Sequence, residues 1–450
     1  MAAQSSRSTD HTLTFEDHYE ALTEARQVEK ARSKGRETCL QNFTRITHGR
    51  LALFNNRAEA STSGLHTTDT PGHIFLRFAD EKFVDELIRT SQAHFSKDEL
   101  PYTFQLTPSA QRRLMYRYFC QRILIQAAPA KRFRQNFPFE GTSSPIGERV
   151  FQMLVRCCNI GFEAAAVLNR NYSLFMRVGR VLTLDEKLVP FKGPSPHKRY
   201  VPNKQPNTGH WISELTTKGQ FSGLPFTLRH FPLLGGVTTK MVELFSWATQ
   251  GCSAIFPPII VSDPYYLDDA SLVLLRRQKN KFLCAVNPTR FKELWERCAE
   301  HVKKIGDVSL FRNKSTGEIG LMVWDAHWDK RHLLTNAFDY SEDPGLPINS
   351  EVITDAYCFY FNTCDRFNHL IGKAKWPYRR GSWQNNYDSF FFASLLMNVY
   401  VAYHEVRHLP ARMEWGEFGK LLASSLGQLV EKKYASLDDK KKRVWEEQPR

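Results

Sequence analysis

The hydrophobic period of the chain changes near residue 180, and this change restricts the folds that the chain can adopt. Between residues 78 and 170, apolar residues recur at helical spacing, as in TPSAQRRLMYRYFCQRILIQ (107–126). After residue 180, the segments RVLTLDEKLVPF, HWISELTTKG and LPFTLRHFPLL alternate between apolar and polar residues, as strands do. We therefore expect a helical part followed by a sheet.

The segments that follow predict alternating helices and buried strands. Residues 238–251 are typical of a helix, and IFPPIIVSD (255–263) is a continuous apolar run, typical of a strand buried on both faces. A helix, the strand KFLCAVN (281–287) and another helix (290–304) come next. Three strands followed by helix, strand, helix, strand and helix match a ribonuclease H-like core of the α/β class.

This order divides the chain into six predicted segments. A ribonuclease H-like catalytic core in two parts is preceded by a helical N-terminal domain and interrupted by a small β insertion before the last core helices. The segments are a mobile N-terminal arm (1–74), the helical domain (75–175), the first part of the core (176–304), the β insertion (305–347), the last core helices (348–435) and a basic C-terminal tail (436–450).

The charge of the chain favours polyanionic partners. Sixty-one lysines and arginines against 47 acidic residues give a net charge of +14, and nucleic acid is the first candidate partner for such an excess. A solvated basic surface would explain the same excess. The run from Lys440 to Arg443 is of the nuclear-import type, which predicts a nuclear protein, and a charged chain end is the alternative.

The cysteines and the apolar segments indicate the kind of cellular compartment in which the chain folds. The nine cysteines include no C-x-x-C pair and suit free thiols in a reducing environment. The N-terminus lacks an apolar signal segment, and no run approaches transmembrane length. The longest apolar stretch (390–403) is broken by Ser394 and Asn398 and predicts a buried helix, so we expect no membrane partner.

Three aspartates fall where such a core would hold metal ions. Asp185 interrupts a strand, Asp263 ends the buried apolar run, and Asp365 lies in a late helix. Converging carboxylates repel each other unless cations lie between them, and hard oxygen ligands select Mg²⁺ or Mn²⁺. Two such ions about 3.5–4 Å apart can activate a water or a 3′-hydroxyl against a phosphodiester. Each acid taken alone could be an ordinary surface charge.

Four segments resemble the piggyBac-type transposases, with the similarity spread over about residues 75–435. The most specific is LDEKLVPFKGPSPHKRYVPNKQPNTGHW (184–211), with its Asp-Glu pair and its Arg-Tyr-x-Pro-Asn-Lys run. VSDPYYLDDASLVLL is similar to the family's second-acid segment, VWDAHWDKRHLLTNAF to its β insertion, and YFNTCDRFNHLI to its third-acid helix. Trp383 matches the tryptophan that the family places after the third acid.

The resemblance implies a DNA transposase of the DDE/DDD class. In such an enzyme Asp185, Asp263 and Asp365 would be catalytic and hold two Mg²⁺ (or Mn²⁺) ions, and an exposed Trp383 would stack on an unpaired DNA base. The partner would be double-stranded DNA, as transposon ends and a TTAA-type target. The resemblance leaves open whether the protein forms a homodimer. The residues expected to contact DNA are Trp383, Lys192, Lys198, Arg199, Lys204 and Arg290.

The chain also departs from the family pattern. Asn368 stands where the family usually has a further acid, and its amide oxygen could join the metal site without bringing charge. Arg290 and Asn287 meet only loosely the basic residues expected after the next strand. No cysteine follows Cys364, whereas family members often end in a zinc domain. A domesticated, catalytically silent DNA-binding protein is therefore the second hypothesis.

A literal H-E-x-x-H motif supplies a third hypothesis. His404, Glu405 and His408 would share one helix face, as the zinc ligands and general base of a metallopeptidase do. Leu409 and Pro410 end the helix directly afterwards, and the same helix matches the piggyBac-type helix, where no zinc is needed. We therefore interpret the motif as a helix end and keep the zinc metallopeptidase as a remote alternative.

Overall fold

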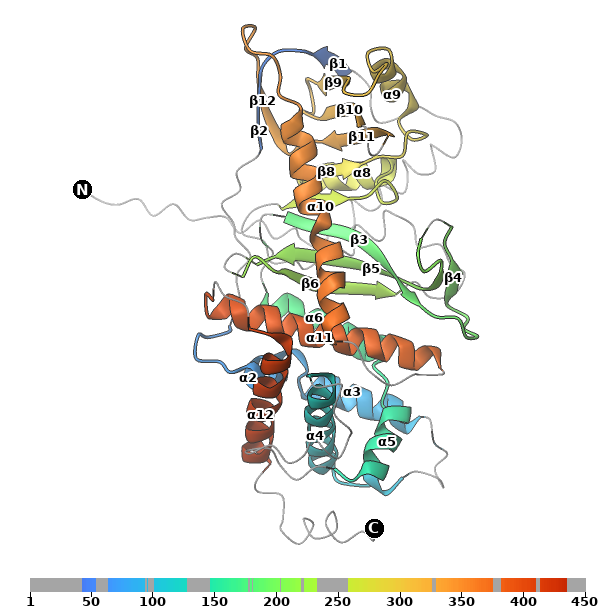
Figure 1. Ribbon diagram of the computed structural model, residues 1–450, viewed down its shortest axis with the longest axis vertical. Helices are drawn as coiled ribbons and strands as arrows, with labels where there is room; N and C mark the ends of the chain where they lie inside the picture. Colours follow the sequence, from blue (N-terminus) through green and yellow to red (C-terminus); the bar gives the residue numbers. More distant parts are fainter. Residues whose placement is uncertain are drawn as a thin grey trace, which may run out of the picture.

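The computed structural model describes most of the chain between residues 43 and 434. The described ranges are 43–53, 64–93, 95, 101–127, 146–176, 179, 181–202, 204–219, 222–232, 258–325, 329–374, 382–409 and 413–434. The predicted helix at 238–251 and the basic tail (436–450) lie outside these ranges. Figure 1 shows an elongated molecule in which a large sheet lies above a group of helices.

The centre of the sheet contains the five strands that the sequence predicts. β3 (Val181–Pro190), β5 (Thr208–Lys218) and β6 (Pro225–Pro232) pair in antiparallel fashion. β7 (Ile259–Ser262) and β8 (Lys281–Ala285) follow on the other side of β3, with both pairings parallel. The spatial order is thus β6, β5, β3, β7, β8, and all four residues of β7 are buried, as expected for a central strand.

The predicted β insertion is a continuation of this sheet. β11 (Asp329–Thr335) pairs with β8, and β10 (Ile319–Asp325) and β9 (Val308–Asn313) follow outward. Pairing with β11 gives the free edge of β8 its hydrogen-bond partners, which explains why the hairpins join the sheet. A ten-stranded mixed sheet results, with the short β4 (Lys198–Tyr200) at the opposite end of the path.

The expected mobile arm (1–74) differs from the structure at residues 43–53 and 71–74. β1 (Phe43–Ile46) pairs with β9 at the sheet edge, and β2 (Arg50–Leu53) pairs with β12 (Phe338–Ser341). Phe43 is buried and Ile46 is half-buried against the apolar core, while Thr44 and Arg45 are exposed, so the two ends of this strand pack on the sheet edge. The first helix of the described ranges, α2 (Pro71–Phe78), begins inside the expected arm, with the Thr70 hydroxyl capping the His73 N–H.

The lower part of the molecule is helical (Figure 1). After α2 come α3 (Glu81–Gln92), α4 (Pro108–Ala127), α5 (Glu148–Cys157) and α6 (Phe162–Phe175). The last helix of the described ranges, α12 (Trp415–Lys433), packs on α4 and α2, whereas the sequence predicts it to be part of the core. Gly72 permits this contact, because a Cβ there would lie 2.6 Å from the backbone nitrogen of Leu426.

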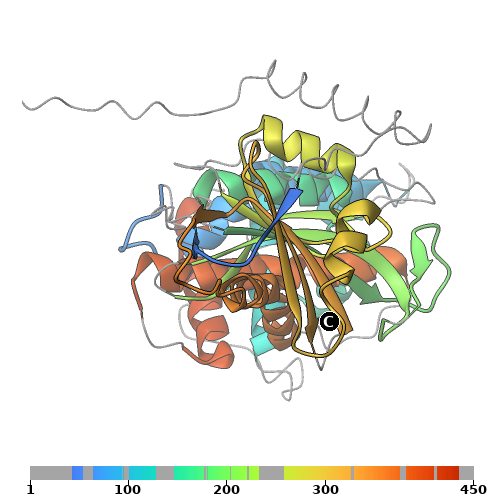
Figure 2. The ribbon, with the colours of Figure 1, turned by 90° about the horizontal axis from the view of Figure 1, so that it is seen from above.

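The remaining long helices lie on the two sides of the sheet (Figure 2). α8 (Asp269–Arg277) begins at the capping residue Asp268, and α9 (Lys292–Ala299) contacts β9 and β10. α10 (Glu351–Ile371) packs across β3, β5, β6 and β7. α11 (Trp383–Val406) is buried over most of its length, as its apolar sequence predicts.

No single helix in the described ranges is long and apolar enough to span a membrane, and only the pair α5 and α6, bent by 90°, meets that test together.

Candidate functional site

Two of the three predicted acids meet where β7 ends. The last residue of β7, Ser262, lies opposite Leu184 of β3, and Asp263 and Pro264 then leave the sheet. β3 continues to Pro190, so Asp185 and Glu186 lie beside the carboxyl end of β7. One carboxylate oxygen from each of Asp185, Glu186 and Asp263 lies within 4.8 Å of the other two. Ligands of α/β sheets collect at such strand ends.

Burial and mutual repulsion disfavour negative charge on these groups. Asp185 is 7% exposed, and burial, followed by the charges of Glu186, Asp263 and Asp365, raises its pKa well above the ordinary value. Burial and Glu186 also raise the pKa of Asp263 to about 7, although its Oδ1 accepts a 2.8 Å hydrogen bond from the Tyr265 N–H. A divalent cation would relieve both effects, and carboxylate oxygens suit Mg²⁺ or Mn²⁺.

Asp365 lies next to this group without joining it closely. It is an exposed residue of α10, and it is absent from the set of carboxylates within 4.8 Å of one another. Its charge nevertheless contributes to the raised pKa of Asp185 and of Glu214, so it is a near neighbour of both. The structure therefore brings Asp185 and Asp263 together and leaves Asp365 at the side.

Glu214 is a buried acid that the sequence analysis missed. It lies opposite Asp185 on β5, is fully buried, and its Oε1 is 3.6 Å from Nε2 of His230 on β6. Burial raises its pKa to about 7, against the opposing effects of Lys187 and a side-chain hydrogen bond from Asn368. Asn368, expected beside the metal, thus lies beside Glu214. The only sequence signal is a glutamate within the apolar, alternating segment HWISELTTKG.

The predicted basic residues lie at different distances from the acids. Lys204 is the nearest, with Nζ 2.6 Å from Oε1 of Glu186 and 5.2 Å from the centre of the Trp211 ring. Burial raises the pKa of Tyr265 overall, and the positive charge of Arg199 is close enough to oppose that rise. Arg290 donates a 2.6 Å hydrogen bond to the carbonyl of Leu267, which lies within the second-acid segment.

Lys192 is exposed on the segment between β3 and β4, and Lys198 is exposed at the first residue of β4. The ammonium of Lys198 donates a hydrogen bond to the Gly193 carbonyl at 3.0 Å, which restrains the loop that carries Lys192.

Trp383 is less exposed than the sequence analysis expects. It begins α11 and is half-buried, with its ring stacked on Phe162 at 6.4 Å and edge-on to His197 at 4.9 Å. It therefore contacts α6 and the loop after β3. A neighbouring stack joins Tyr387 of α11 to His210 of β5, with ring centres 4.4 Å apart.

The H-E-x-x-H residues lie at the end of α11. His404 is buried, with Nδ1 2.8 Å from the Tyr400 carbonyl, and its Nε2 accepts a hydrogen bond from the Met413 N–H at 3.2 Å. Glu405 accepts hydrogen bonds from the backbone and the hydroxyl of Ser222. His408 lies beyond the helix with a positive φ of 51°. These contacts agree with the interpretation as a helix end.

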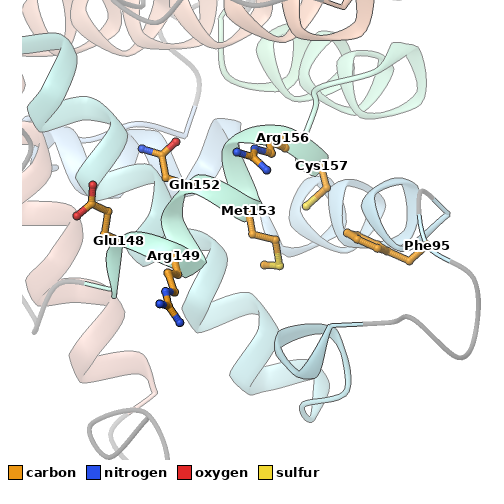
Figure 3. Close-up of a pocket in the computed structure, with 7 residues that line it drawn as sticks. All are labelled: Phe95, Glu148, Arg149, Gln152, Met153, Arg156 and Cys157. Carbon is orange, nitrogen blue, oxygen red and sulfur yellow. The ribbon is translucent and has the colours of Figure 1, made fainter. Parts of the chain in front are cut away.

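A pocket of about 660 Å³ lies on α5, in the helical part of the molecule (Figure 3). Phe95, Met153 and Cys157 line it together with the charged residues Glu148, Arg149 and Arg156. None of its lining residues belongs to the acid site, so we assign it no part in that chemistry.

Comparison with known proteins identifies the fold. No protein-family model matches the chain, and no curated protein matches it. Among solved structures, the chain is similar to a piggyBac transposase in a synaptic complex with hairpin DNA, with a TM-score of 0.63 over 86% of each chain and 15% sequence identity. The chain therefore has a piggyBac transposase-like fold, a mixed sheet with helices on both sides.

Proposed function

We propose that this protein is a DNA transposase of the piggyBac type that cuts and joins DNA strands with the help of divalent metal ions. The observation that carries the proposal is the group of carboxylates at the carboxyl end of β7, in a fold similar to that of a piggyBac transposase. The proposal also accounts for the net charge of +14.

The sheet supports a ribonuclease H-like core within this proposal. β3, β5 and β6 are antiparallel neighbours, and β7 and β8 continue in parallel on the other side of β3. The first acid lies within the first of these strands, and the second follows the fourth, as the core requires. α10 then brings the third acid, Asp365, across the same strands.

The acids are suited to holding Mg²⁺ or Mn²⁺. Asp185 and Asp263 would bind one ion, and Asp365, with Asn368 nearby on the same helix, would help to hold a second. Bound ions of this kind activate a water or a 3′-hydroxyl and stabilise the leaving oxygen of a phosphodiester.

The basic residues would bind the phosphates of double-stranded DNA at the acids. Arg199, Lys204 and Arg290 lie nearest the site, and the exposed Lys192 and Lys198 extend the surface along the loop after β3. A first cut at each element end would free a 3′-hydroxyl that attacks the opposite strand to form a hairpin. Trp383 would stack on the base unpaired in that step, and the reopened end would join a TTAA-type target.

A catalytically silent DNA-binding protein of the same fold is the second candidate. Two observations favour it: Asp365 lies outside the close group of carboxylates, and Asn368 brings no charge. In either case a nuclear protein is expected, because the partner is DNA.

Strand cleavage tests the proposal. Purified protein, Mg²⁺ and duplexes carrying the element's end sequences should give nicked DNA, and Asp263→Ala should reduce the rate at least about 1,000-fold, since metal assistance is worth several kcal/mol. Asp355→Ala, which removes an exposed acid from α10, is the matched control and should cut normally. Tight binding without any cutting would favour the silent protein, and failure to bind DNA would contradict both candidates.

A further inference from the structure

The second residue of the Asp-Glu pair has a contact pattern that its place in a strand does not predict. Successive side chains of a strand point to opposite faces, so Glu186 should lie on the far side of the sheet from Asp185. In the structure, one carboxylate oxygen of Asp185 and one of Glu186 each lie within 4.8 Å of an oxygen of Asp263. β7 ends at Ser262, opposite Leu184, so from residue 185 onward no strand of the described ranges pairs with this edge of β3. The two carboxylates can therefore meet past the end of β7.

The oxygens of Glu186 have unequal surroundings. Oε1 accepts the 2.6 Å ion pair from Lys204. Oε2 is buried and has no hydrogen-bond partner among the described residues, and the side chain is only 4% exposed. A buried carboxylate oxygen without a partner destabilises the fold, and two other acids lie beside it, so a bound cation would supply the missing partner.

The charges at this point match one divalent cation. Asp185, Glu186 and Asp263 carry three negative charges when ionised, and Lys204 compensates one of them. The remaining two equal the charge of Mg²⁺ or Mn²⁺. Glutamate oxygens are also the hard donors that these ions prefer.

We infer that Glu186 is the third carboxylate ligand of the ion bound by Asp185 and Asp263, which it would contact through Oε2. Asp365 would then bind a second ion or contact the DNA next to the first ion. This inference rests on the proposed metal-dependent function and names a ligand within the same site.

Manganese binding to the full chain tests this assignment without DNA. Free Mn²⁺ is counted by its electron paramagnetic resonance signal during titration of the wild type, Glu186→Gln, Asp263→Asn and Asp365→Asn. Glu186→Gln and Asp263→Asn should each weaken Mn²⁺ binding by about tenfold or more, because even outer-shell changes cost about 10- to 100-fold in metal affinity. Asp365→Asn should leave the tightest site within about threefold of the wild type.

The matched control is Glu318→Gln. Glu318 is also a buried glutamate with one cationic partner, Arg276 at 2.5 Å, and it lies directly before β10, away from the acids. Its variant should bind Mn²⁺ like the wild type. Circular dichroism shows whether each variant is folded, and Glu186→Asp, which keeps the charge but retracts the oxygens, replaces Glu186→Gln if the latter does not fold.

The outcomes separate the ligand from the function. Normal Mn²⁺ binding by folded Glu186→Gln and Glu186→Asp, with loss in Asp263→Asn, would overturn the ligand assignment and leave the transposase proposal intact. Weakened binding in the Glu186 variants of a protein that never cuts DNA would support the ligand and overturn the proposed function. Failure of the wild type to bind Mn²⁺ would overturn the ligand assignment.

Discussion

Arg122 of α4 and Asp388 of α11 form an ion pair that is completely buried. The two guanidinium nitrogens lie 3.0 and 2.7 Å from the two carboxylate oxygens, and both side chains are 0% exposed. The Ile160 N–H donates a further hydrogen bond to Asp388, and the guanidinium lies 3.9 Å from the centre of the Phe392 ring. This pair joins the helical part of the chain to the helix that begins at Trp383.

Removing either partner should destabilise the fold strongly. Arg122→Met and Asp388→Ala should each lower the free energy of unfolding by about 3–5 kcal/mol, because each leaves a buried charge without its partner. Urea unfolding measures the loss. Arg89→Gln, in an exposed pair with Glu86, is the control and should cost at most about 1 kcal/mol. A loss below 1 kcal/mol for both buried variants would contradict the role of the pair.

Gly209 should tolerate no side chain. It lies opposite Pro190 of β3 and Arg199 of β4, and a Cβ there would overlap the carbonyl oxygen of Val189. Gly209→Ala should therefore cost about 1–3 kcal/mol of stability and weaken DNA binding through the displaced β4. Gly147→Ala, with nothing within 4 Å of its Cβ, is the control. Equal melting temperatures of the two variants would contradict the close contact.

His230 should make the protein less stable in acid. Burial, assisted by Lys187, lowers its pKa to about 3 from an ordinary 6.5, so the folded state holds its ring neutral. The stability from this group is complete above pH 6.5 and is lost as the pH falls from 6.5 toward 3, at up to about 1.4 kcal/mol per pH unit. In His230→Gln, the part of the pH dependence that His230 causes should disappear when the free energy of unfolding is measured in urea between pH 6 and 4. His210→Gln serves as a comparison, since the pKa of His210 is lowered to about 4. An unchanged slope in His230→Gln would refute the prediction.

Lys192 and Lys198 should contribute to DNA affinity through counterion release. Lys192→Gln and Lys198→Gln should each reduce the slope of log K against log salt by about 0.9, the value for one lost phosphate contact. Fluorescence anisotropy of labelled duplex at several salt concentrations measures this slope. Lys292→Gln, at an exposed position on α9, should leave it unchanged. Equal slopes for all three variants would exclude the loop after β3 from the DNA surface.

Local patterns were sufficient to predict the central strands. β3, β5, β6, β7 and β8 occur in the expected order, because burial on one or both faces leaves a period or an apolar run in the sequence. Asp263 at the end of β7 could be predicted for the same reason.

Features that depend on distant partners could not be predicted. Glu186 joins the acids only because β7 ends opposite Leu184, which no local pattern of β3 records. β1 forms because the free edge of β9 lies next to it, with Phe43 opposite Asn313. Trp383 is half-buried because α6 and the loop after β3 pack against it.

Location of bound manganese tests the central claim most directly. Crystals of the wild-type protein grown with Mn²⁺ should give an anomalous difference peak in contact with the carboxylates of Asp185 and Asp263, and Asp263→Asn crystals should lose it. Manganese bound only at other positions, or no peak at these two side chains when the ion is in excess, would contradict the account.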